Sequence, residues 1–254
     1  MVRPPRRPLI DASEPHNEEA IEVVQVQLGQ GVDLAPLRSL LSADEQARAS
    51  AYRSDEARDV FTLARGLLRL ELSRRLSCPP NEIGFDLRSS GKPDLKPREG
   101  IPADWRFSVS HTGTHVVLAF ARGADVGIDI ERLDRVARPL DIAKRYFTTE
   151  EVRALEALPE SGLPRAFFAG WTRKEAVVKA RGSTMAESLN TLTVDLDPEA
   201  IHPQAQDTAI GPARAHCTLT SFEFPAVRLI GAVAWCSAPP PRLRFRVVSG
   251  ARFD

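Results

Sequence analysis

Two carboxylates placed two residues apart are the first candidates for chemistry in this sequence. Asp129 and Glu131 belong to the segment Gly127–Glu131 (GIDIE), whose β-branched residues predict a strand with both carboxylates on one face. Neighbouring carboxylates repel each other unless a proton or a cation lies between them, and Mg²⁺ takes oxygen ligands together with substrate phosphates. Taken alone, the segment fits an edge strand with an acidic outer face better than it fits a metal site.

A predicted helix over 165–181 carries two further reactive side chains. Glu175 and Lys179 are four residues apart and share one helix face, and Gly182 is a typical helix end. Glu175 could be a third acidic ligand or a base, and Lys179 could donate a proton or hold a phosphate. The other interpretation is a surface Glu–Lys pair worth roughly 0.2–0.5 kcal/mol.

Basic residues nearer the N-terminus could bind phosphate. Three arginines recur at helical spacing, namely Arg58, Arg65 and Arg69. Such a stripe fits a phosphate-binding face or a solvated face equally well. Lys92 lies in a tight turn, and His111 follows Ser110 at a strand end, so each matters only if it faces a site. An acid triad beside these residues predicts a Mg²⁺-dependent reaction on a phosphorylated ligand.

Elements that must position these side chains can be read from caps and periodicity. Capping boxes at Ser42 and Thr148 predict helices over about 43–76, with a break near Ser54, and from about 149 to 158. A shorter helix is predicted over 139–146, and 198–212 is a predicted loop. Strands are expected near 21–28, 106–110, 115–121, 126–131, 191–196, 215–222, 229–236 and 243–248, the last as an edge or an appendage.

Composition sets broad limits on the protein. The 254 residues are 43% hydrophobic, and the 34 Lys and Arg residues balance the 34 Asp and Glu residues, so net charge does not argue for a polyanionic partner. We expect no nucleic-acid and no membrane partner. Cys78, Cys217 and Cys236 are scattered, which predicts a reducing compartment without disulfides, hence a cytoplasmic protein.

Motifs across the middle of the chain occur in the order found in one enzyme family. They are Gly91–Pro93, Phe107–His111, Gly127–Glu131, Phe147–Glu151 and Trp171–Lys179. Together they resemble the signature of the 4′-phosphopantetheinyl transferases, and of their long, surfactin-synthetase-activating type. The GIDIE segment alone would not be specific, whereas the ordered set is. The match covers 91–179 and extends weakly back to Arg58, so the last third of the chain lies outside it.

The resemblance implies an α/β (α+β) fold, a pseudo-dimer of two similar lobes that each pack a small antiparallel sheet with a long helix. The expected divisions are a disordered tail over 1–20, an N-terminal lobe over 21–122 and a C-terminal lobe over 123–254. Coenzyme A would lie in the cleft between the lobes. A pseudo-dimer already contains both halves of the site, so a monomer is expected.

The resemblance also implies a reaction. The enzyme would transfer 4′-phosphopantetheine from coenzyme A to a serine hydroxyl of an apo acyl or peptidyl carrier protein, releasing 3′,5′-ADP. Mg²⁺ would be held by Asp129, Glu131 and Glu175. Glu175, directly or through a metal-bound water, would take the serine proton, and Lys179 would offset charge on the leaving phosphate.

Residue roles follow from the same resemblance. The expected catalytic residues are Glu175, Lys179, Asp129 and His111. The expected coenzyme A contacts are Arg58, Arg65, Lys92, Ser110, His111 and Lys179. One family feature is missing, because Glu45 has the wrong charge for the basic residue near the 3′-phosphate, and Arg48 and Arg53 are the candidates to replace it.

Two other functions stay open from the sequence. One is another Mg²⁺-dependent nucleotide transferase, although the chain has no phosphate-binding GxxxxGK[ST] loop. The other is a catalytically inactive module that binds carrier proteins or coenzyme A, against which the intact acid and lysine set argues. The carriers and their pathway, whether fatty-acid, polyketide or nonribosomal-peptide synthesis, are not specified.

Overall fold

The computed structural model describes residues 20–29, 32–100, 102, 104–134, 138–184, 189–207, 217–236 and 242–248. The helices are α1 (Ala35–Ser39), α2 (Ala43–Ser50), α3 (Asp55–Leu76), α4 (Pro139–Tyr146), α5 (Thr149–Glu156) and α6 (Leu163–Arg181), with 3-10 turns η1 (Pro80–Glu82) and η2 (Pro225–Val227). The strands are β1 (Ala20–Gln27), β2 (Phe85–Leu87), β3 (Pro93–Leu95), β4 (Trp105–Thr112), β5 (His115–Arg122), β6 (Asp125–Arg132), β7 (Leu192–Val194), β8 (Ala205–Asp207), β9 (Thr218–Phe224), β10 (Leu229–Cys236) and β11 (Arg242–Val248).

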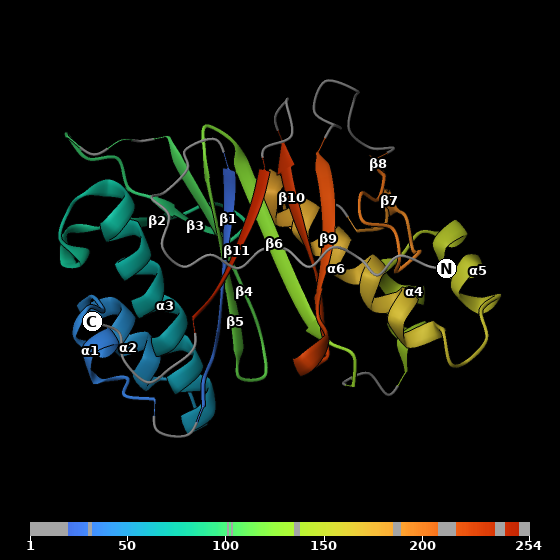
Figure 1. The fold of residues 1–254 in the computed structure, drawn as a ribbon, viewed down its shortest axis with the longest axis horizontal. Helices are drawn as coiled ribbons and strands as arrows, with labels where there is room; N and C mark the ends of the chain where they lie inside the picture. The colour runs from blue at the N-terminus through green and yellow to red at the C-terminus, as the bar shows by residue number, and fades with distance from the viewer. Residues whose placement is uncertain are drawn as a thin grey trace.

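Two sheets form the centre of the molecule, with a long helix on either side (Figure 1). The first sheet has the strand order β11-β1-β5-β4, and the second has the order β6-β10-β9. The pairs β2–β3 and β7–β8 form separate hairpin-like ribbons. Helix α3 lies on the side of the first sheet and α6 on the side of the second.

The cores show how these layers stack. On β5, Leu118 and Phe120 join a core that contains α3 residues such as Leu67, whereas Val117 and Ala119 join a second core. That second core also contains β6 and β10 residues, so it lies between the two sheets. Both faces of the central strands are therefore buried, which explains why they are apolar along nearly their whole length.

The fold class predicted from the sequence is confirmed, since small, largely antiparallel sheets pack against helices. The similarity of two lobes stays a prediction, as does the division at 122. Strand β11 completes the first sheet by pairing in parallel with β1, with Ala20 opposite Arg242. The predicted loop over 198–212 contains β8, which corrects that expectation. Residues 1–19 of the predicted tail lie outside the described residues.

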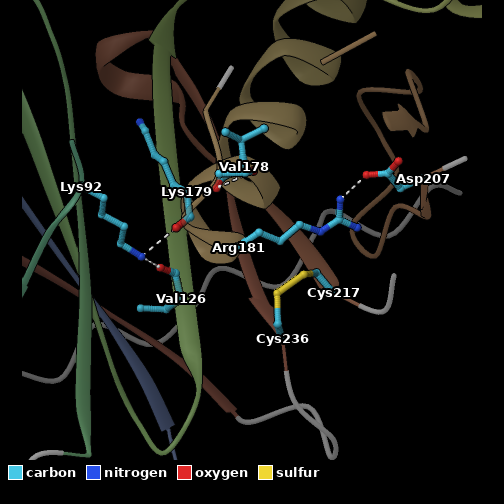
Figure 2. Close-up of a disulfide and its surroundings, with 9 residues drawn as sticks. Lys92, Val126, Val178, Lys179, Arg181, Asp207, Cys217 and Cys236 are labelled. Atoms are coloured by element: carbon cyan, nitrogen blue, oxygen red, sulfur yellow. Dashed lines mark hydrogen bonds and ion pairs between the residues drawn. A yellow bond between two sulfur atoms is a disulfide. The ribbon is translucent and has the colours of Figure 1, made fainter. Parts of the chain in front are cut away.

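The expectation that the cysteines exclude a disulfide is wrong. Cys217 and Cys236 are bonded to each other, at the ends of neighbouring strands (Figure 2). The pairing of β9 with β10 brings Trp235 opposite Thr218, which places the next residue outward on each strand face to face. Sequence spacing alone does not reveal this register. Cys78 is a free thiol, and the cysteines no longer support a reducing compartment.

In the part of the chain that the structure describes, no helix combines the length and the apolar character needed to span a bilayer.

Candidate active site

Strand β6 and helix α6 pack unusually closely because of one glycine. A Cβ atom built on Gly127 would lie 1.9 Å from the carbonyl oxygen of Ala176 and 2.4 Å from the amide nitrogen of Ala180. Only glycine allows the strand backbone to lie this close to the helix backbone. The close packing brings the acidic side chains of β6 and the Glu175–Lys179 face of α6 to the same place.

An acid–lysine cluster forms at this contact. The Lys179 ammonium lies 2.6 Å from Asp129 Oδ1 and 3.8 Å from Glu175 Oε2. The Ser110 hydroxyl donates a 2.6 Å hydrogen bond to the same Asp129 oxygen. The other Asp129 oxygen, Oδ2, is buried and has no hydrogen-bond partner among the described residues. A buried carboxylate oxygen without a partner is costly and marks a position suited to a ligand.

Charge in the cluster shifts the pKa values of its members. Burial and, to a smaller extent, the neighbouring Asp129 and Glu131 carboxylates together raise the pKa of Glu175 to about 7, although Lys179 opposes the rise. Burial acts to lower the pKa of Lys179, but Asp129 and Glu175 outweigh it, so that pKa is raised. The site therefore combines a proton acceptor that titrates near neutrality with a lysine that stays charged.

Strand β4 separates this cluster from a pocket. Ser108 and Thr112 face β6, where the Ser108 hydroxyl accepts the Ile128 N–H and the Thr112 hydroxyl donates to Glu131 at 2.9 Å. Val109 and His111 alternate with them and line the pocket on the opposite side. The period of two along β4 thus places the predicted histidine and the acids on opposite faces of one strand.

The pocket has a volume of about 380 Å³ and lies between α3, the β2–β3 hairpin and β4. Its lining contains Arg48, Arg65 and His111 together with the aromatic rings of Tyr52 and Phe61. The rings lie 5.5 Å apart, and the Arg48 guanidinium lies 5.3 Å from the Phe61 centroid. A pocket with aromatic rings and cationic groups suits a ligand that has both a planar ring and phosphates.

Arg65 lines the pocket with a guanidinium that is mostly withdrawn from water. Its guanidinium is 4.9 Å from the Phe85 ring centroid and 3.5 Å from a Glu45 oxygen. Burial lowers its pKa, and Glu45 only partly offsets that effect. Its Nη1 atom is buried without a hydrogen-bond partner in the described part of the chain. A donor left unpaired at the wall of a pocket is positioned to bind an anion.

Other arginines of the predicted stripe serve the fold. Arg58 is partly exposed, pairs with Asp55 at 2.7 Å and is not among the residues that line the pocket. Arg69 is 3% exposed, and it donates to Glu45 and to the carbonyl of Ile83 at 2.9 Å. Arg53, one candidate for the missing basic residue, does not line the pocket, whereas Arg48 does.

The Lys92 ammonium contacts backbone carbonyls of the chain itself. It donates to the carbonyl of Val126 at 2.8 Å and to the carbonyl of Lys179 at 2.7 Å (Figure 2). It thereby reaches from the β2–β3 turn to both β6 and α6. The phosphate contact predicted for it stays a prediction, as do the other site assignments.

A buried ion pair missed by sequence reasoning joins two of the motifs. Lys174 is fully buried and lies 2.7 Å from Glu151 Oε2, while Glu151 Oε1 accepts the Val194 N–H at 2.8 Å. Both residues stand in the quoted motifs, but nothing in their spacing showed that they would meet. Lys174 directly precedes Glu175, so this pair anchors the helix turn that carries the proton acceptor.

The three acids were expected to form a metal site. Glu175 is influenced by both Asp129 and Glu131, so the structure brings the three carboxylates into one neighbourhood. Within the described ranges, no three His, Cys, Asp or Glu side chains are grouped closely enough to hold a metal ion. In the structure the Lys179 ammonium lies against Asp129, and it offsets part of the negative charge there.

The chain matches two family models that together cover most of it. Residues 31–122 match the model described as 4′-phosphopantetheinyl transferase, N-terminal, and 125–224 match the 4′-phosphopantetheinyl transferase superfamily. The boundary between the two matches falls in the turn between β5 and β6. The pocket residues on α3 and β4 thus lie in the first matched region, and the acidic residues on β6 and α6 lie in the second.

Individual relatives agree with the family models. The 4′-phosphopantetheinyl transferase HetI of Nostoc sp. is 36% identical over 165 residues, 65% of this chain and 69% of HetI. The 4′-phosphopantetheinyl transferase Sfp of Bacillus subtilis is 28% identical over 204 residues, 80% of this chain and 84% of Sfp. The slr0495 protein of Synechocystis sp. is 33% identical over 158 residues, 63% of its own length. This chain belongs to the 4′-phosphopantetheinyl transferase family.

Proposed function

We propose that this protein transfers the 4′-phosphopantetheine group of coenzyme A to a serine hydroxyl of an apo acyl or peptidyl carrier protein and releases 3′,5′-ADP. The observation that carries the proposal is the placement of the Asp129–Glu175–Lys179 cluster and the basic pocket on the two sides of β4. Such an arrangement can hold the nucleotide end of a ligand while its pyrophosphate reaches the acids. Relatives named as 4′-phosphopantetheinyl transferases support the reaction class.

Chain residues divide the chemistry between them. Glu175 accepts the proton of the carrier serine, whose oxygen then bonds to the phosphorus that carries the pantetheine. The bond from that phosphorus to the bridging oxygen breaks, and 3′,5′-ADP leaves. Lys179 stays charged and offsets the negative charge of the departing phosphate, to which its ammonium can turn from Asp129.

The oxygen atoms of the acids suit a divalent cation by their chemistry, although within the described residues the three side chains are not grouped closely enough to hold one as they stand. Asp129 Oδ2 is a buried acceptor without a partner among the described residues. Burial and the nearby Asp129 and Glu131 carboxylates together raise the pKa of Glu175 to about 7, so Lys179 does not fully compensate the negative charge there. Asp129, Glu131 and Glu175 would hold Mg²⁺, whose bound charge would disperse the charge that develops on the pyrophosphate.

Coenzyme A would be held by the pocket between α3 and β4. Arg65, with its unpartnered Nη1, and His111 would contact phosphates, and Arg48 is the best placed residue for the 3′-phosphate because it lines the pocket whereas Arg53 does not. The Tyr52 and Phe61 rings offer a surface for the adenine. Ser110 supports the site by holding Asp129, and Arg58 has its nearest charges on its own helix.

A direct assay tests the proposal. Apo carrier proteins of fatty-acid, polyketide and nonribosomal-peptide type are incubated with the protein, coenzyme A and Mg²⁺, and their masses are measured. We expect at least one carrier to gain the mass of one phosphopantetheine, and the pattern of kcat/KM values to identify the preferred class. If coenzyme A binds but no carrier gains mass, the protein is a binding module and the transferase proposal is wrong.

Asp129→Ala gives a specific check of the acid cluster. We expect activity to fall by about 100-fold or more because Lys179 and Ser110 lose their shared partner and a ligand position is lost. Circular dichroism should show that the variant stays folded. Unchanged activity in this variant, or wild-type activity that persists in EDTA, would contradict the role of the carboxylates as cation ligands.

A further inference from the structure

Lys92 connects the first half of the chain to both elements that carry the acids. Its ammonium donates to the Val126 carbonyl, near the start of β6, and to the Lys179 carbonyl, in the last turn of α6 (Figure 2). The Lys179 carbonyl also accepts the Gly182 N–H of the helix cap at 3.3 Å, and the helix dipole favours a cation at this end of α6. Val126 lies three residues before Asp129, and Lys179 carries the ammonium that contacts Asp129.

The outer edge of β6 is satisfied by side chains from the first half of the chain. Strand β6 is an edge of the second sheet, so in the described part of the chain no strand pairs with its outer edge, although β4 packs beside it. Hydroxyls of Ser108 and Ser110 accept the Ile128 and Ile130 N–H groups, and Lys92 supplies the donor for the Val126 carbonyl. Lys92 thus belongs to the set of side chains that fixes β6 in place.

A second contact anchors the same hairpin. Arg88 on the β2–β3 turn donates to Asp94 at 2.9 Å and pairs with Asp125 at 3.0 Å, directly before Val126. The hairpin also lines the pocket through Leu87, Gly91 and Pro93. The hairpin therefore lies between the ligand pocket and the β6–α6 junction, tied to the junction by Lys92 and Arg88.

We propose that Lys92 is a positioning residue, which fixes the β6–α6 junction and so places the Lys179 ammonium against Asp129, instead of contacting the phosphates of coenzyme A. The inference rests on the proposed function, because its effect is on the transfer step. A phosphate contact and a positioning contact predict different kinetics. Loss of a phosphate contact weakens coenzyme A binding, whereas loss of a positioning contact lowers kcat with binding largely preserved.

Lys92→Met separates the two roles, because methionine keeps the apolar part of the side chain and removes the donors. We expect kcat to fall about 10- to 100-fold, with the Kd for coenzyme A, measured by calorimetry without carrier, within about threefold of wild type. Lys92→Arg keeps donors and charge and should restore most of kcat. The matched control is Lys96→Met, an exposed lysine just beyond the same hairpin, which should leave both values unchanged.

Several outcomes would overturn the inference. A rise of about tenfold or more in the Kd for coenzyme A assigns Lys92 to the phosphates, and an unchanged kcat removes the positioning role. If Lys92→Met does not fold, Asp125→Asn loosens the same hairpin and should lower kcat by a smaller factor at constant Kd; an unchanged kcat there is equally decisive. If the wild-type protein modifies no carrier, the proposed function is rejected together with the role of Lys92. If the wild type is active but the variants do not show the expected kcat and Kd values, only the role of Lys92 is rejected.

Discussion

Single residues in this protein show that burial decides how a charge is used. Glu175, Lys92 and Lys174 are all withdrawn from water, but each finds a different compensation. Lys174 pairs with Glu151, and Lys92 donates to two carbonyls. Glu175 lies near other carboxylates, which carry the same charge. The contacts of Lys174 and Lys92 stabilise the fold. The pKa of Glu175 is raised instead, which is typical of a group that takes part in a reaction.

The raised pKa of Glu175 predicts a pH-dependent stability of the metal-free protein. Because the folded-state pKa, about 7, exceeds the ordinary value of 4.5, the folded protein binds the proton more tightly, and stability is lost as pH rises from about 4.5 to about 7. Glu175→Gln does not titrate there. In EDTA at pH 8 we expect urea unfolding to show the variant more stable than wild type by up to about 3 kcal/mol. A difference that does not depend on pH between 4.5 and 8 would contradict this cause.

The Lys174–Glu151 pair predicts a large cost for removing one partner. Lys174→Met leaves the Glu151 carboxylate buried without its cation, so we expect the free energy of unfolding to fall by about 3–5 kcal/mol. Lys144→Met is the matched control, because Lys144 pairs with Glu156 at 3.0 Å on the surface and should lose about 1 kcal/mol or less. Equal losses in the two variants, measured by chemical unfolding, would show that the buried pair has no special role.

At the scale of elements, the sequence predicted what is encoded locally. Both capping boxes form as expected, with Ser42 accepting the Glu45 N–H and Thr148 accepting the Glu151 N–H. Gly182 ends α6 in the left-handed conformation, and the break near Ser54 separates α2 from α3. These features depend on side chain to backbone bonds within a few residues, so the sequence contains all the information they need.

Contacts between distant segments could not be predicted in this way. The meeting of Lys92 with Val126 and Lys179 depends on the packing of a hairpin against a strand and a helix. The acids stand out in the sequence because a strand places alternate side chains on one face, and the same alternation on β4 separates its serines from its histidine. That alternation was the available signal that Ser110 faces Asp129 while His111 faces the pocket.

Gly127→Ala tests the close packing of β6 on α6. The added methyl group would lie 1.9 Å from a backbone oxygen of α6, which cannot move without shifting the helix. We expect the free energy of unfolding to fall by about 3 kcal/mol or more, with loss of transferase activity. Gly29→Ala is the control, because nothing lies within 4 Å of its Cβ position. Similar melting temperatures for the two variants would show that the strand and helix can separate at little cost.

At the scale of the whole molecule, the protein is a stack of helix, sheet, sheet and helix (Figure 1). The core between the sheets contains residues from β1, β5, β6 and β10, and Phe245 from β11. The family resemblance predicted two lobes, but it did not cover the last third of the chain. Hence nothing in the sequence indicated that β11 would return to the first sheet, because a parallel pairing across the whole chain leaves no local signal.

Removal of residues 242–254 tests the contribution of β11. The deletion removes Phe245 from the core between the sheets. It also removes Arg246, whose guanidinium lies 2.5 Å from the Glu71 carboxylate. We expect the free energy of unfolding to fall by more than about 3 kcal/mol, because a buried aromatic residue and a partner of a buried carboxylate are lost together. An unchanged denaturation midpoint in the truncated protein would argue against this contribution.

The pairing of β1 with β11 also constrains how the chain folds during synthesis. Ala20 is synthesised long before its partner Arg242, so the first sheet is completed only after Arg242 has been made. Until then one edge of β1 is an unpaired strand edge, a surface that invites pairing with other chains. Contacts of such wide sequence separation also slow folding. The nascent protein is therefore most exposed to misassembly before β11 is made, and dependence on chaperones should be greatest at that stage.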